Sequence, residues 1–174
     1  MNAIARPGND HATGLDALAR AGHAVPAPDL HRTMALRYAT YRDERMHVLD
    51  GAHATVDWFR AQGVRVALVT NGPSDAQRAK IERFDLGHRF DHIQIEGEFG
   101  QGKPEPTVYR HALERLGCEA CDAWMVGDNY EWEVVAPQKL GMAGIWYDPF
   151  GAGVPAHATA LPTRIITRLS ELVE

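Results

Sequence analysis

One stretch of this chain, residues 64–69, constrains the fold more than any other. Its sequence, Val-Arg-Val-Ala-Leu-Val, is nearly all apolar and rich in β-branched side chains. A short run of this kind suits a strand that is buried on both faces, as in a parallel sheet. Strand patterns then alternate with helix patterns along the rest of the chain, which implies right-handed βαβ units. We therefore predict an α/β fold with a Rossmann-like parallel sheet and flanking helices.

The bounds of the expected elements follow from apolar periodicity and from Gly and Pro breakers. Helices are expected at 54–62, 74–84, 106–116, from about 132 to 140, and at 167–173, and strands at 64–69, 90–95, 123–126, 143–147 and 163–166. Ser74 or Asp75 is expected to cap the second of these helices. Gly97, Gly100 and Gly102 are expected to make a mobile loop before the third.

The N-terminal part of the chain differs in character from this core. Residues 1–14 are polar and read as a loose tail, whereas residues 15–50 carry two helical patterns. The longer pattern, 30–48, has one apolar side and a basic face. We therefore expect a tail at 1–14, a helical segment at 15–50 and the α/β core at 51–174.

The charge and the length of the apolar runs exclude some classes of partner. The chain has 174 residues and a net charge of −5, which argues against general nucleic-acid binding because that requires a basic surface. No apolar run approaches the length of a membrane span, and the N-terminus has no signal-peptide core. We expect a cytoplasmic protein with neither a nucleic-acid nor a membrane partner.

Two cysteines, Cys118 and Cys121, have the Cys-x-x-Cys spacing. A redox motif of that form normally opens a helix after a strand, but this pair follows a helix and precedes a strand. No second pair exists to complete a zinc site. We interpret the two cysteines as an ordinary loop pair.

The aromatic and histidine side chains give structural expectations. Trp58, Trp124 and Trp146 are expected in or near the core. His88 and His92 are four residues apart but span a turn into a strand, so we expect both to be solvated.

Polar residues that suit phosphate and metal chemistry follow two of the expected strands. Thr70, Asn71 and Gly72 follow the first, where a hydroxyl and successive turn amides can meet phosphate oxygens. Asp128 and Glu133 bracket the turn after the third, and oxygen ligands of this kind suit Mg²⁺. Open α/β sheets bind their ligands at the carboxyl ends of strands, so these groups are expected to lie together.

These pieces, with Gly102-Lys103-Pro104 between them, resemble in order and spacing the haloacid dehalogenase (HAD) superfamily of phosphohydrolases over roughly residues 51–148. The resemblance implies a HAD-like core with a small helical cap at 15–50. It also implies that Thr70 and Lys103 act on the phosphoryl group, with Asn71 and Gly72 beside them in substrate binding. The alternatives are an ordinary strand-to-helix turn and a solvated surface lysine.

On the metal side, the resemblance makes Asp128 a ligand of Mg²⁺. Five residues later the family commonly has a second Asp, where this chain has Glu133, whose extra methylene shifts the ligand position by about a bond length. The alternative is a helix cap formed by Asp128 or Asn129. Dehalogenating members generally carry a Ser-Ser-Asn motif where this chain has Gly-Asp-Asn, which favours phosphate esters.

The family's nucleophile pattern, Asp-x-Asp-x-Thr/Val after the first strand, is absent before residue 64. The nearest string, residues 9–13, places Asn9 and His11 where the two carboxylates belong. The resemblance puts the first strand in the middle of the sheet, so the strands at 64–69 and 123–126 should pair directly or leave open edges. A truncated gene, a misassigned start and a diverged non-enzyme all fit this pattern.

Two hypotheses follow. The chain is a phosphatase-like hydrolase of small phosphorylated molecules that is inactive alone because it lacks the nucleophile. Alternatively, it is a non-catalytic remnant that binds a phosphorylated ligand or a protein. A third class, another Rossmann-like fold such as a receiver domain, needs an acidic cluster after its first strand, which is equally absent.

Overall fold

The computed structural model describes residues 45–174 together with six earlier positions: Leu30, Thr33, Met34, Arg37, Thr40 and Tyr41. The chain divides into two compact units, Met1–Met46 and His47–Glu174. In the first unit the described residues from Leu30 to Arg45 are helical, as the pattern at 30–48 predicts. The expected tail and the short helical pattern at 15–21 lie outside the described residues.

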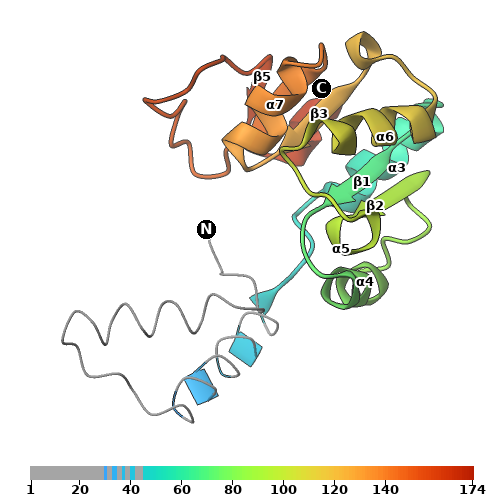
Figure 1. Cartoon of the computed structure of the whole chain (residues 1–174), viewed down its shortest axis with the longest axis vertical. Coiled ribbons are helices and arrows are strands. Elements are labelled where there is room, and N and C mark those ends of the chain that lie inside the picture. Colours follow the sequence, from blue (N-terminus) through green and yellow to red (C-terminus); the bar gives the residue numbers. More distant parts are fainter. Residues whose placement is uncertain (1–29, 31–32, 35–36, 38–39, 42–44) are drawn as a thin grey trace. The chain divides into compact units, whose positions relative to one another are not determined.

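The second unit has the predicted α/β architecture, with strands alternating with helices (Figure 1). Its elements are α3 (Ala52–Ala61), β1 (Ala67–Thr70), α4 (Ser74–Arg83), β2 (His92–Ile95), α5 (Glu96–Phe99), α6 (Pro106–Leu116), the 3₁₀ turn η1 (Ala120–Asp122), β3 (Trp124–Gly127), the π-helical segment η2 (Glu131–Val135), α7 (Ala136–Gln138), β4 (Ala143–Tyr147), β5 (Arg164–Ile166) and the 3₁₀ turn η3 (Leu169–Val173). No helix in the described part of the chain is both long and apolar enough to cross a membrane.

The strands form two separate parallel ladders. β1 pairs with β2, whereas β3, β4 and β5 form a second sheet in that order. Among the described residues β1 and β3 do not pair with each other. Of the two outcomes expected without a central strand, the described part of the chain has the second, in which each of these strands has one unpaired edge within that part.

Helix α6 packs against both halves of the core. It contacts β1 and β2 on one side and α7 on the other (Figure 1). It begins at Pro106, whose missing N–H is harmless in a first turn, and it ends at Leu116, followed by the C-cap Gly117 with the left-handed φ of 60° common at helix C-termini. Its own Tyr109 and Leu113 form a buried cluster with Ala136 and Met142.

Several local expectations require correction. Neither Ser74 nor Asp75 caps α4, because its N-cap is Pro73 and the Ser74 hydroxyl donates instead to Glu98 at 2.6 Å. The expected loop from Gly97 begins as a helical turn, α5. β1 and β2 start later than predicted, since an apolar run does not show which of its residues join a ladder.

The tryptophans divide between core and surface. Trp146 is buried in β4 as predicted, but Trp58 and Trp124 are 44% and 54% exposed, so the prediction for these two was wrong. Phe59 lies between them, with ring centroids 5.2 Å from Trp58 and 6.2 Å from Trp124. Trp124 is the first residue of β3, the edge strand of its ladder among the described residues.

Of the two histidines expected to be solvated, only His88 is exposed. His92 is half-buried, with its Nε2 3.4 Å from the side-chain oxygen of Gln94. His111 Nδ1 lies 2.8 Å from the same oxygen, and the two imidazole centroids are 5.4 Å apart. Burial lowers the pKa of His92, and the charges of His111 and Arg115 lower it further.

This histidine pair predicts a loss of stability in mild acid. Because the pKa of His92 is lower in the folded chain than in the unfolded one, the unfolded chain binds the extra proton first. The free energy of unfolding should therefore fall as the pH drops below about 6.5, the ordinary histidine pKa. Urea unfolding between pH 5 and 8 measures this slope, and His92→Gln should flatten it. An unchanged slope in that variant would assign the effect to other groups.

Candidate functional site

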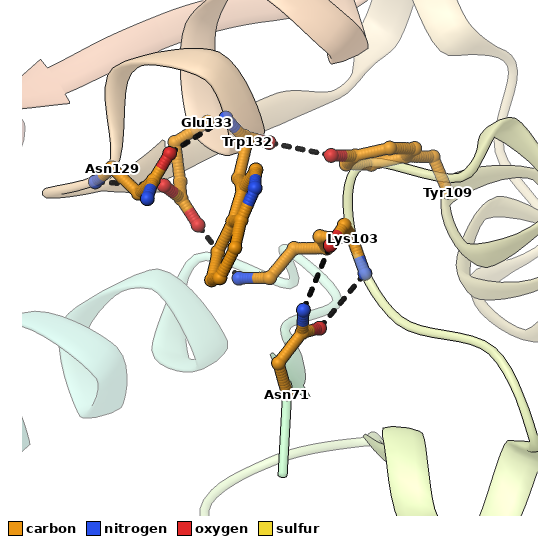
Figure 2. Close-up of polar contacts among 6 residues, drawn as sticks. All are labelled: Asn71, Lys103, Tyr109, Asn129, Trp132 and Glu133. Carbon is orange, nitrogen blue, oxygen red and sulfur yellow. Dashed lines mark hydrogen bonds and ion pairs between the residues drawn. The ribbon is translucent and has the colours of Figure 1, made fainter. Parts of the chain in front are cut away.

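The polar residues predicted for function gather where the strands of both ladders end. A connected set of contacts links the turn after β1 to the turn after β3 (Figure 2). It includes the side chains of Asn71, Lys103, Tyr109, Asn129 and Glu133 and the backbone of Trp132. The two ladders are therefore connected at this point through side chains.

Lys103 and Glu133 form a buried ion pair at the centre of this set. Lys103 Nζ lies 2.7 Å from Glu133 Oε1, and the two side chains are only 9% and 4% exposed. The alternative of a solvated surface lysine is therefore wrong. A pair this far from water holds each charge in place, because either charge alone would lose its hydration without compensation.

The backbone of the turn also holds Glu133. Its second oxygen accepts a hydrogen bond from the Asn129 N–H at 2.8 Å. Burial nevertheless raises the pKa of Glu133, since desolvation outweighs the opposing effects of Lys103 and Asn129. Gly127 makes room for this side chain, because a Cβ there would lie 2.4 Å from Glu133 Cγ. The longer acid at position 133 thus depends on the absence of a side chain at position 127.

The main chain of Lys103 is held from the other ladder. The side-chain oxygen of Asn71 accepts the Lys103 N–H at 2.8 Å, and its amide nitrogen donates to the Lys103 carbonyl at 2.8 Å. Figure 2 shows the two bonds side by side. Gln77 in turn donates to the Asn71 carbonyl at 2.9 Å.

The neighbouring glycine of the turn is tied to α5. The Gly72 N–H donates to Glu96 Oε2 at 2.9 Å, and the Gly72 carbonyl accepts the Gly97 N–H at 3.0 Å. The Gly72 amide, predicted to meet substrate, is therefore already paired with a carboxylate in this structure.

On the other side, the side chain of Asn129 binds the first turn of η2. Its Oδ1 accepts the Trp132 N–H at 3.1 Å, although the N-cap of η2 is Tyr130, which has no side-chain cap hydrogen bond. The Tyr109 hydroxyl of α6 donates to the Trp132 carbonyl at 2.6 Å. Burial raises the pKa of Tyr109, so this hydroxyl keeps its proton.

The structure brings the main predicted residues to one edge. Thr70 directly precedes Asn71, and Asp128 directly precedes Asn129, so both adjoin residues in contact with the Lys103–Glu133 pair. Asp128 itself is exposed. Cys118 and Cys121, by contrast, are free thiols that contribute nothing to this network.

The described residues do not by themselves make a site that fits Mg²⁺. They contain no group of three or more His, Cys, Asp or Glu side chains placed to hold a metal ion. Of the two predicted ligands, Asp128 supplies one exposed carboxylate, while both oxygens of Glu133 already accept hydrogen bonds. An ion at Asp128 would need further oxygen ligands.

Sequence reasoning missed one participant, Tyr109, and one contact, between Asn71 and Lys103. Tyr109 lies in the middle of a helix, and its periodicity indicates only that it faces the core. The hydrogen bonds between Asn71 and Lys103 join residues 32 apart in the sequence. The only signal for them in the sequence was the position of Asn71 in the Thr-Asn-Gly turn directly after a strand, where Asn side chains often bind the backbone.

Comparison with known proteins shows which family the chain is similar to. A family model described as haloacid dehalogenase-like hydrolase matches residues 9–141. Phosphoserine phosphatase of Thermus thermophilus is 37% identical over 134 residues, which are 76% of this chain and 52% of that protein. N-acylneuraminate-9-phosphatase of Rattus norvegicus is 34% identical over 110 residues, 63% of this chain and 44% of that protein.

A solved structure of a HAD phosphatase is also similar to this chain. A HAD phosphatase from Thermococcus onnurineus superposes with a TM-score of 0.67 at 28% identity, covering 76% of this chain and 60% of that one. The chain thus spans about half the length of the two curated relatives that it matches.

Proposed function

We propose that this chain, which belongs to the haloacid dehalogenase-like hydrolase family, binds the phosphate of a small phosphorylated molecule at the carboxyl ends of β1 and β3. The observation that carries the proposal is the placement of Lys103. Lys103 is buried between the Thr-Asn-Gly turn and the Gly-Asp turn, and both its backbone and its ammonium group are held by hydrogen bonds or an ion pair.

The chemistry of these groups suits a phosphoryl oxygen. An ammonium group has three donors, and Glu133 takes one of them, which leaves others for phosphate. Thr70, the last residue of β1, offers a hydroxyl at the same edge. Asp128 is the candidate carboxylate for Mg²⁺, which would polarise the phosphoryl group when bound.

We further propose that this chain alone does not turn over phosphate esters. Hydrolysis through a covalent intermediate requires an activated nucleophile, and residues 1–63 contain no Asp-x-Asp-x-Thr/Val pattern. The non-catalytic alternative, binding of a phosphorylated ligand, is favoured by the same Lys103 geometry, which is complete without that nucleophile.

Two measurements on the purified chain test these proposals. We expect no Mg²⁺-dependent hydrolysis of p-nitrophenyl phosphate, and turnover that disappears in Asp128→Ala would contradict inactivity. We expect inorganic phosphate to bind, as followed by ³¹P line width. Lys103→Arg should weaken this binding, whereas Lys139→Arg, at a lysine whose side chain is 68% exposed, should not. Equal binding by both variants would refute the assigned site.

A further inference from the structure

We propose that Asn71 is a positioning residue, whose side chain fixes Lys103 for phosphate rather than contacting the phosphate itself. This inference rests on the proposed function. Asn71 Oδ1 and Nδ2 engage the N–H and the carbonyl of one residue, Lys103, each at 2.8 Å. The side-chain amide therefore bonds this residue as a neighbouring peptide group would, and its hydrogen-bonding groups face the protein.

The fit around this contact is close. A Cβ at Gly102 would lie 2.9 Å from Asn71 Nδ2 and 2.7 Å from Glu96 Cδ. The residue before Lys103 must therefore lack a side chain for the backbone to reach Asn71. On the other side, Asn71 directly follows β1 and its carbonyl accepts from Gln77, so its own position is set by the first ladder.

Lys103 is consequently fixed from two directions. Asn71 holds its main chain to the β1 turn, and Glu133 holds its ammonium group at the β3 turn (Figure 2). Lys103 itself lies in the connection between α5 and α6, outside any helix or strand. Without Asn71, the position of the ammonium group would depend on the ion pair alone, and the backbone that carries it would gain freedom.

The test follows the Lys103 ammonium group directly by ¹H–¹⁵N NMR of the whole chain, with its signal assigned by its loss in Lys103→Arg. Asn71→Ala removes both hydrogen bonds to the Lys103 main chain. We expect the ammonium protons to exchange with water about tenfold faster and inorganic phosphate to bind about tenfold more weakly, because only part of the lost bonding free energy reaches the ammonium group. Asn71→Asp keeps the acceptor for the Lys103 N–H and should fall between. Gln138→Leu removes another amide-to-carbonyl bond, to Leu161, and should leave the signal unchanged.

The outcomes separate this proposal from the one it rests on. A folded Asn71→Ala chain with an unchanged ammonium signal overturns the positioning role, and weaker phosphate binding with that signal unchanged would make Asn71 a direct ligand. If Asn71→Ala does not fold, the ammonium signal of Asn71→Asp tests the positioning role instead, and an unchanged signal in that variant overturns it. Wild-type chain that binds no phosphate refutes the proposed function, whereas the ammonium signal still tests how Lys103 is held.

Discussion

Lys103→Met is expected to lower the free energy of unfolding by about 3–5 kcal/mol, the usual effect of leaving one buried charge without its partner. The variant leaves the buried carboxylate of Glu133 with only the Asn129 N–H to compensate its charge. Urea unfolding followed by circular dichroism measures the change. The matched control is Lys139→Met, which breaks an exposed pair with Glu131 at 3.5 Å and should cost under about 1 kcal/mol.

The pH dependence of this loss identifies its cause. Burial already raises the pKa of Glu133, and removing Lys103 takes away the charge that opposes the rise. The folded variant should therefore bind a proton at Glu133 more readily than the unfolded chain does. The deficit should be largest at neutral pH and shrink as the pH falls through the raised pKa. A deficit that is constant from pH 7 to pH 4 would indicate lost packing instead of an unpaired charge.

Gly127→Ala is the second variant with a large expected effect, and it should lower the free energy of unfolding by about 3 kcal/mol. Its added methyl would lie 2.4 Å from Glu133 Cγ and 2.8 Å from Cδ, which is overpacking against an atom near the root of the side chain. Glu133 would have to move, and the ion pair with Lys103 would weaken. The same unfolding measurement applies, with Gly87→Ala as control, since a Cβ there meets only Ile81 at an ordinary 3.9 Å.

A coupling measurement shows whether Glu133 is the obstacle. In a Glu133→Ala background the added methyl meets no Cγ, so Gly127→Ala should cost much less than in the wild-type chain. Equal costs in the two backgrounds would place the strain elsewhere in β3.

Local sequence patterns predicted much of the fold. The bounds of α6 and β4 were predicted correctly because a proline, a glycine and an unbroken apolar run mark their ends. The start of β1 was not predicted correctly, because it is set by pairing with β2. The helical conformation of α5 was not predicted either, because it depends on the packing of Gly97 against the turn after β1. Trp124 shows the same limit, since an aromatic residue at a strand start is buried only if a neighbour covers it.

For the site, the sequence predicted which residues would gather but not how they bond. Thr70 and Asp128 were placed at one edge by the rule that parallel strands end together, and Lys103 was added to them by the family resemblance. The partners of Lys103 could not be predicted, because they depend on contacts between residues about 30 positions apart. The roles of Asp128 and Glu133 toward Mg²⁺ stay predictions.

The division of the strands into two ladders has a consequence for local opening of the fold. Backbone hydrogen bonds run within each ladder, but among the described residues β1 and β3 share none. Cooperative opening units in proteins tend to follow such supersecondary boundaries. The β1–β2 half can thus open locally while the β3–β4–β5 half stays closed, with Lys103 and helix α6 connecting the two halves.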